Sequence, residues 1–353
     1  MKNLYVIIPD KPSQILKEMI NAAILTCNNL YEINYIDNEN NIPDLQNSRL
    51  IFAIQLNEAG FNINLAKYIT TIHKRSKSAL YGCIGGVLIH GHSELYTKTT
   101  AQNIIFHANQ LGCRFPGRPL VEATKSLSNF LTIQKVVKKP LKDVCLAECT
   151  KLGKSITEDN PKKVDNPNIL VLHASNRKTS NTLNLWDMIN KHLNNVTIKE
   201  IHIENGTIRD CKGCRYTTCK HYGKQTTCFY GGFMVEEIYP AILDSDGIIF
   251  ICPNYNDSLS ANMTAVINRL TALFRKTKFY DKTLFGVIVS GNSGSDALGK
   301  QLISALNINK TFRLPPYFSI TATANDKGAI FDIPNIEESA ENFAKNILAE
   351  IKA

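Results

Sequence analysis

The sequence has no apolar run approaching the roughly 18 residues that a membrane-spanning helix needs. Its first residues, MKNLYVIIPD, lack the long apolar region and cleavage site of a signal peptide, and are typical of a first strand. The ten cysteines are scattered, apart from one tight group, which favours a reducing compartment over a disulfide framework. We therefore expect a cytoplasmic protein without a membrane span.

The charge pattern lacks any basic run with interleaved aromatic residues. Forty lysines and arginines against 31 aspartates and glutamates give a net charge of +9. We interpret this excess as a mild preference for anionic ligands or partners, and we do not expect nucleic acid to bind. The length of 353 residues predicts about two domains, and an apolar content of 44% allows each a full core.

Apolar runs that predict strands alternate with amphipathic patterns that predict helices, which indicates a parallel sheet with helices on both faces. In the first half we expect strands at residues 4–8, 31–36, 50–56 and 80–89, and helices from about residue 13, near 63–74, near 99–111 and at 141–156.

The two halves resemble each other, which indicates a domain-sized repeat. Leu50–Ile72 aligns with Gly247–Leu270, and Gly85–His92 aligns with Gly286–Asn292. A polar segment with two prolines, TEDNPKKVDNPN, follows the first half and is typical of a linker. We expect an N-terminal domain at 1–157, a linker at 158–168 and a C-terminal domain at 169–353.

The stretch 168–182, NILVLHASNRKTSNT, combines a buried strand, a polar turn and the start of a helix. The free N–H groups of a first helical turn, together with nearby hydroxyls and an arginine, suit a phosphate group. An ordinary capped helix would have the same composition, because serine and asparagine are good N-caps. This stretch alone therefore leaves both interpretations open.

Two later loops distinguish these interpretations. CPNYNDSLSANMTAVINRL follows the apolar run 247–251, and SGNSGSD follows the run 284–289. The set S-x-R-x-x-S-N-T, then P-x-Y with a helix ending in N-R, then a glycine-rich loop, resembles the flavodoxin-like NADPH-dependent FMN reductase and iron–sulfur flavoprotein family. The resemblance covers residues 168–353. Together with the internal repeat, it implies two tandem flavodoxin-like α/β domains, each a doubly wound three-layer α/β/α unit with strand order 2-1-3-4-5. The resemblance also implies FMN as cofactor and NAD(P)H as co-substrate.

Because all three loops follow strand ends, we expect them to converge on one crevice. The resemblance implies that the first loop binds the phosphate, the second lies along the isoalloxazine edge and the third approaches its pyrimidine side. Tyr255 either stacks on the flavin or packs at an interface. The expected flavin-binding residues are Ser175, Asn176, Arg177, Thr179, Ser180, Asn181 and Thr182, then Pro253, Asn254, Tyr255, Asn256, Asp257 and Ser258, then Ser290, Gly291, Asn292 and Gly294.

The N-terminal copy lacks this chemistry. Its first turn contains Asp10, which would repel a phosphate, and Pro12, which has no N–H to donate. Gln55 stands where the second copy has Pro253. We expect no flavin of its own there. Because family members commonly dimerise near the flavin, the resemblance implies an intramolecular pseudo-dimer, whether the chain is a monomer or a homodimer. The loop 91–98, GHSELYTK, either covers the flavin of the second copy or is a surface turn.

One compact group of cysteines lies in the C-terminal half: Cys211, Cys214, Cys219 and Cys228. The resemblance implies a [4Fe–4S] cluster with four thiolate ligands at this place, although the spacing is longer than the usual C-x-x-C-x-x-C. Zinc, with His221 nearby, and reduced or redox-active thiols are the alternatives.

These features predict an FMN-dependent NAD(P)H oxidoreductase that passes electrons to a small-molecule acceptor or a redox protein. The cofactor carries the hard chemistry, so no catalytic side chain is expected. The alternatives are an electron-transfer flavoprotein, which a cluster in the cysteine loop would favour, and a scaffold that has lost its flavin.

Overall fold

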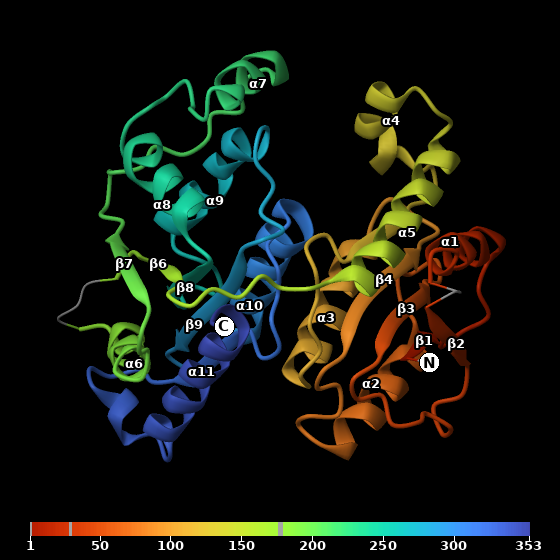
Figure 1. Cartoon of the computed structure of the whole chain (residues 1–353), viewed down its shortest axis with the longest axis horizontal. Helices are drawn as coiled ribbons and strands as arrows, with labels where there is room; N and C mark the ends of the chain where they lie inside the picture. The colour runs from red at the N-terminus through yellow and green to blue at the C-terminus, as the bar shows by residue number, and fades with distance from the viewer. Residues whose placement is uncertain (1, 28–29, 176–178) are drawn as a thin grey trace. The chain divides into compact units, whose positions relative to one another are not determined.

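The structure is a computed structural model that describes residues 2–27, 30–175 and 179–353. The chain divides into two compact units, Met1–Asn160 and Pro161–Ala353 (Figure 1). Within the described residues no helix is long and apolar enough to cross a membrane.

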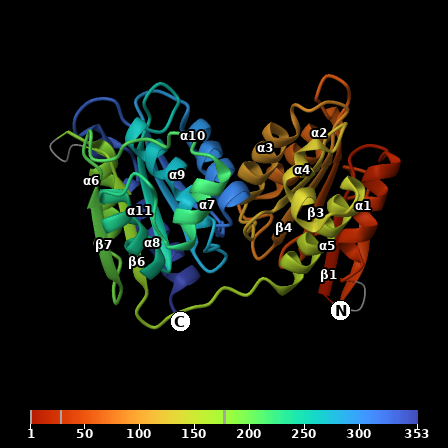
Figure 2. The same cartoon turned by 90° about the horizontal axis from the view of Figure 1, so that it is seen from above.

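The N-terminal unit is built on a five-stranded parallel sheet of order β2-β1-β3-β4-β5. Helices α1 and α5 pack together on one face, and α2 and α3 lie on the other (Figures 1 and 2). Its elements are β1 (Lys2–Ile7), α1 (Gln14–Ile24), β2 (Tyr31–Ile36), β3 (Arg49–Gln55), α2 (Ile63–Arg75), β4 (Ile84–His90), α3 (Thr97–Gln110), β5 (Leu120–Ala123), the 3-10 turn η1 (Ser128–Phe130), α4 (Leu131–Val137) and α5 (Leu141–Glu158).

The C-terminal unit repeats this order, with a parallel sheet β10-β9-β8-β6-β7. Helices cover both faces of the sheet, and α6 packs against α11 on one of them (Figure 2). The elements are β6 (Asn168–His173), α6 (Asn181–Asn190), β7 (Thr197–His202), α7 (Tyr216–Lys224), η2 (Met234–Ile238), α8 (Tyr239–Asp244), β8 (Gly247–Pro253), α9 (Ala261–Phe274), β9 (Thr283–Ser290), α10 (Ser295–Leu302), η3 (Ile303–Ile308), β10 (Ser319–Thr323), η4 (Ala329–Asp332) and α11 (Ile336–Ile351). The predicted fold class is confirmed.

The central strands are buried along almost their whole length because helices cover both of their faces. In β8, the six residues from Gly247 to Cys252 are all buried, and all eight residues of β9 are buried. The single tryptophan, Trp186 on α6, is fully buried in the same core.

The two units repeat a detail that follows the fourth strand in each sheet. Arg114 forms an isolated parallel bridge with Ile84, and Arg313 forms the same bridge with Thr283. Each bridge joins the first residue of a strand to the segment that leads into the last strand. The internal repeat therefore extends beyond the strands to their connections.

The strand pairing tests the predicted alignment of the halves. Gln55 and Pro253 end equivalent strands, as predicted. The two bridges make Ile84 equivalent to Thr283, so Val87 is equivalent to Gly286. The predicted match of Gly286 with Gly85 is therefore wrong by two residues. That alignment paired glycines, whereas the register follows the burial of whole strands.

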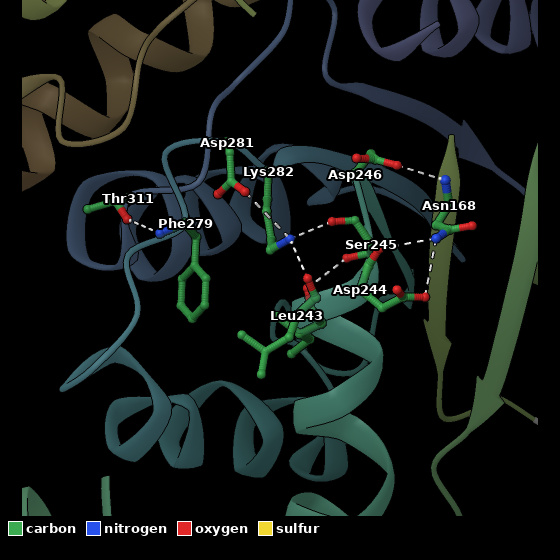
Figure 3. A network of polar contacts seen from close by, with 10 residues as sticks. Asn168, Leu243, Asp244, Ser245, Asp246, Phe279, Asp281, Lys282 and Thr311 are labelled. Carbon is green, nitrogen blue, oxygen red and sulfur yellow. Dashed lines mark hydrogen bonds and ion pairs between the residues drawn. The ribbon is translucent and has the colours of Figure 1, made fainter. Parts of the chain in front are cut away.

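A buried lysine stabilises the end of the C-terminal sheet at which β6, β8 and β9 begin (Figure 3). Lys282 Nζ donates to the carbonyl oxygens of Leu243, at 3.0 Å, and of Ser245, at 2.5 Å, at the end of α8. The N–H of Asn168 donates to Asp246 Oδ2 at 2.9 Å. An ammonium group beside the last carbonyls of a helix also complements the helix dipole.

Candidate functional site

The strand order of the C-terminal unit reverses between β6 and β8. In doubly wound sheets, ligands bind beyond the carboxyl ends of the strands at such a reversal. The loops that follow β6 and β8 therefore diverge around the expected crevice, and both contain predicted flavin-binding residues.

The first loop leaves β6 and enters α6. Ser175 is 2% exposed, and among the described residues no group hydrogen-bonds to its hydroxyl. Ser180 is the N-cap of α6, and its Oγ accepts a hydrogen bond from the Leu183 N–H at 3.2 Å, which leaves its O–H free to donate. Thr182 is buried in the first turn, whereas Thr179 is exposed. Asn176 and Arg177 lie outside the described residues.

Asn181 joins this loop to the segment after β10. Its Nδ2 donates to the carbonyl oxygens of Ala324, at 3.1 Å, and of Asp326, at 2.7 Å. Its Oδ1 accepts the Gly328 N–H at 3.0 Å. These bonds occupy both ends of the amide, so Asn181 positions the loop through backbone contacts.

The second loop contains a tight turn at Tyr255–Ser258. The backbone N–H groups of Tyr255 and Ser258 each donate to the other residue's carbonyl oxygen, at 3.3 and 3.1 Å. Asn256 and Asp257 have φ angles of 53° and 56°, the left-handed pair of a type I′ turn. Asparagine and aspartate tolerate this conformation best among non-glycine residues. The turn presents Tyr255 to solvent, with 52% of its surface exposed.

The second and third loops interlock. Asn254 Nδ2 lies 3.2 Å from Ser290 Oγ and donates to the Ser293 carbonyl at 2.9 Å. Gly294 has a φ of +86°, and a Cβ there would lie 2.0 Å from Asp257 Oδ1. The two loops therefore form one rigid wall, for which a glycine at 294 is required.

A fourth loop, residues 324–328 after β10, completes the edge and was not predicted from the sequence. A Cβ on Gly291 would lie 2.8 Å from Asn325 Oδ1, so the third loop packs on the fourth. The fourth loop is also the partner of Asn181. The structure therefore brings all three predicted loops together at the carboxyl ends of the strands. Asn292 is exposed there, and Pro253 is half-buried.

The end of β6 carries a polar cluster beside the first loop. The rings of His173 and His202 stack with centroids 4.7 Å apart. His173 Nε2 lies 3.2 Å from Glu200 Oε1, and the indole N–H of Trp186 donates to Glu200 Oε2 at 3.1 Å. The sequence reasoning missed this cluster, because its members are separated along the chain and meet only when β6 and β7 pair.

The four cysteines Cys211, Cys214, Cys219 and Cys228 all line one cavity of about 220 Å³. Helix α7, which lies where a loop was expected, forms one wall, and α9 forms another. Contact with the Cys214 thiol raises the pKa of Tyr230, with burial adding to the effect. Within the described residues, no three histidine, cysteine or acidic side chains lie in metal-binding geometry. The cysteines therefore share a cavity without converging on one point.

The matching edge of the N-terminal unit is filled by its own side chains. Gln55 Oε1 accepts the Ser13 N–H at 3.2 Å and lies 3.0 Å from His90 Nδ1. Ser13 Oγ also lies 2.8 Å from His90 Nδ1. Burial lowers the pKa of His90, and the neighbouring His92 lowers it further, which favours a neutral ring.

Strand order and interlocked loops define the C-terminal unit as a flavodoxin-like domain. The model of the NADPH-dependent FMN reductase family matches residues 167–325, which include the first three loops and the cysteine group. The resemblance to the FMN reductase family is confirmed over residues 167–325, and a flavin-dependent oxidoreductase is the class that this match supports.

No curated protein matches the sequence significantly. Among solved structures, an NAD(P)H:quinone oxidoreductase from Methanothermobacter marburgensis is 11% identical, with 52% of this chain and 97% of that chain covered and a TM-score of 0.39. An azoreductase from Bacillus anthracis str. Sterne is 12% identical, with 51% and 98% covered and a TM-score of 0.37.

Proposed function

We propose that the chain is an FMN-dependent NAD(P)H oxidoreductase whose flavin binds to the C-terminal unit. The observation that carries this proposal is the buried Ser175 hydroxyl, which has no partner among the described residues although it lies at the start of the loop between β6 and α6. A buried hydroxyl without a hydrogen bond costs about 1–3 kcal/mol, so a ligand that accepts a hydrogen bond from it is the simplest reason for its presence.

The first loop supplies a complete set of donors for a phosphate group. Besides the Ser175 hydroxyl, the O–H groups of Ser180 and Thr182 and the N–H groups at the start of α6 lie in the same short segment. The positive end of the helix dipole favours a dianion at this place. The phosphate is therefore the part of FMN that this loop would hold.

The second and third loops would hold the flavin ring. A type I′ turn and a positive-φ glycine bring backbone N–H groups close to a flat ligand without side chains in between. Backbone donors near the ring tune its reduction potential, and FMN itself supplies hydride acceptance from NAD(P)H. The bond from Asn254 to Ser293 fixes the relative position of these loops before the ligand arrives. No acid or base among the side chains is needed.

The N-terminal unit would bind no flavin of its own. Gln55, Ser13 and His90 occupy its strand ends with bonds to one another. Asp10 lies in the loop that would face the phosphate, and its carboxylate accepts a hydrogen bond from Asn64 at 2.6 Å. We therefore expect one FMN per chain.

The experiment is an FMN and riboflavin titration of the purified chain, followed by NADH and NADPH oxidation with menadione as acceptor. We expect absorbance bands at about 370 and 450 nm, one FMN bound per chain, weaker riboflavin binding, and nicotinamide oxidation that depends on FMN. A colourless chain that takes up no FMN would overturn the proposal. Bound FMN without oxidation of either nicotinamide would favour the second candidate.

The second candidate is an electron-transfer flavoprotein with a [4Fe–4S] cluster in the cysteine cavity. It is favoured by the shared cavity of about 220 Å³ and by four thiol donors, the set that such clusters use. Cys211, Cys214, Cys219 and Cys228 would hold the cluster, which supplies one-electron chemistry. Iron and zinc assays on chain purified without oxygen test this candidate. About four irons per chain would support the cluster, and bound zinc would indicate a structural metal site. If the chain contains neither iron nor zinc, the cysteines are free thiols.

A further inference from the structure

Eight exposed lysines and arginines lie within or next to the two segments that line the cysteine cavity, and we call them the basic rim. Its members are Arg209, Lys212, Arg215, Lys220, Lys224, Arg275, Lys276 and Lys278. Asp210 is the one acidic residue in the segments 209–230 and 268–280, and its carboxylate accepts hydrogen bonds from Asn268 and from the backbone of Cys211. The rim therefore has a strong positive charge.

This charge is concentrated locally rather than spread over the unit. The C-terminal unit has 22 lysines and arginines against 18 aspartates and glutamates, so its sequence outside the rim is net acidic. The N-terminal unit has 18 basic against 13 acidic residues and is itself basic. A separation of this kind creates a field that attracts an acidic partner.

Exposed aromatic residues lie within the rim. Tyr216 is 51% and Phe229 58% exposed. Arg275 and Lys220 lie over the Tyr216 ring, at 4.7 and 5.7 Å from its centroid. Lys212 lies 5.6 Å from the centroid of Tyr230. Aromatic and arginine side chains are enriched in protein interfaces. Cations already lie over the Tyr216 ring, which disfavours base stacking and hence nucleic acid.

The cavity at the centre of the rim is connected to the flavin crevice by one helix. Helix α9 begins at Ala261, shortly after the second loop, and its residues Asn268 and Ala272 line the cavity. Seven residues of α-helix separate Ala261 from Asn268, which corresponds to about 10 Å. A partner that docks on the rim is therefore placed close to the crevice.

We infer that the basic rim is the docking surface for a small acidic electron-carrier protein. The inference rests on the proposed function, because the flavin is the source of the electrons. One NAD(P)H supplies two electrons, which reduce two molecules of a one-electron carrier in turn, and one proton passes to solvent. Docking itself depends on the positive charge of the rim and on its exposed rings.

The test measures binding and turnover with two carriers of opposite charge, an acidic rubredoxin and the basic cytochrome c. We expect rubredoxin to bind the purified chain at low ionic strength and its affinity to fall about tenfold or more with added salt, because screening weakens charge pairing at the surface. Cytochrome c should not bind to the rim. The triple variant Lys212→Glu, Arg215→Glu, Lys220→Glu should weaken rubredoxin binding by about tenfold or more, whereas menadione turnover stays within about twofold.

The matched control reverses three exposed lysines of the N-terminal unit, Lys125→Glu, Lys135→Glu and Lys139→Glu. It changes the net charge by the same amount and should leave rubredoxin binding intact. Equal loss in both variants would assign the effect to overall charge and overturn the docking surface. A DNA duplex that binds more tightly than rubredoxin, and is released by the rim variant, would overturn it in favour of nucleic acid.

The measurements distinguish an error in the docking surface from an error in the proposed function. No rubredoxin binding by a chain that holds FMN and oxidises NAD(P)H overturns the docking surface alone. Salt-dependent binding of rubredoxin to a chain that takes up no FMN supports the surface and overturns the proposed function.

Discussion

The indole N–H of Trp186 donates to Glu200 Oε2 at 3.1 Å, and Glu200 Oε1 lies 3.2 Å from His173 Nε2 at the strand end that leads into the first loop. The single tryptophan of the chain is thus a buried reporter beside the predicted phosphate site. We expect FMN to reduce its fluorescence by about half or more, since the flavin absorbs in the emission range of tryptophan. A fluorescence titration measures this, with Trp186→Phe as the zero-signal control. Unchanged emission with FMN visibly bound would contradict the placement.

Ser175→Ala separates binding from stability. Because the hydroxyl has no partner among the described residues, its loss should leave the free energy of unfolding of the apo chain unchanged or raise it by up to about 1–3 kcal/mol. FMN affinity should fall about tenfold, as expected for one hydrogen bond to a charged group, and riboflavin affinity should not change. Urea unfolding and flavin titrations measure these quantities. A loss of apo stability with unaltered FMN affinity would show that Ser175 is a structural residue.

Gly294→Ala tests the interlocked wall of the second and third loops. A methyl group there meets Asp257 Oδ1 at 2.0 Å in a backbone with φ +86°. Gly206→Ala is the matched control, since Gly206 has φ +84° and nothing within 4 Å of its Cβ position. Both variants carry the backbone cost of about 1 kcal/mol. Only Gly294→Ala should also weaken FMN binding, by about tenfold, in a titration. Equal FMN affinity in the two variants would show that the wall does not touch the ligand.

Glu94 gives a pH dependence. Hydrogen bonds from Ser126, Thr124 and Ser128 hold the pKa of this carboxyl at about 2, below its usual value. Because the folded-state pKa is the lower one, the stabilisation is full above pH about 4.5 and is lost as the pH falls towards 2. The difference in urea midpoint between the chain and Glu94→Gln should therefore be present at pH 7 and disappear near pH 2. A difference that is constant over this range would mean that the charge of Glu94 is not involved.

The sequence predicts the first three loops because each follows a buried apolar strand, and the polarity of a residue such as Ser175 contrasts with the strand before it. It does not predict the fourth loop. Strand β10 is short and its outer residues, Thr321 and Thr323, are exposed, so the apolar signal is weak. Asn181 matched the resemblance as a phosphate residue, but its amide bonds to backbone groups near Ala324, more than 140 residues further along the chain. Partners this distant in sequence leave no local pattern.

The cysteine segment also contains features that arise only from contacts in the folded chain. The spacing of the thiols indicated one site, and the structure does bring all four to one cavity. Helix α7 within the segment was missed, because Tyr216 to Lys224 has few apolar residues and its stability comes from packing on α9. Lys212, Arg215, Lys220 and Lys224 of the basic rim lie within the cysteine segment of the sequence. Arg275 and Lys276, at the end of α9, joined it only in the folded chain.

Thiol reactivity distinguishes the two sets of cysteines. The six outside the cavity are buried: Cys27, Cys83, Cys113, Cys145, Cys149 and Cys252. Burial raises the pKa of the Cys27, Cys83, Cys113 and Cys252 thiols, and hydrogen bonding to Cys145, together with burial, raises that of Cys149. A raised pKa keeps these groups protonated at pH 8, and the thiolate is the reactive form. We therefore expect a thiol reagent to modify the four cavity cysteines first, and all ten only after unfolding.

Mass spectrometry of the modified chain identifies the reacting residues, and the same reaction tests the contents of the cavity. In metal-free chain, Cys211 should react fastest because it is the exposed member of the four. If the aerobically purified chain shows four slow cavity thiols that become fast only after a chelator is added, a bound metal protects them. Fast reaction of any of the six buried thiols in the folded chain would contradict the packing of the cores, because a reagent can reach them only when the chain opens locally.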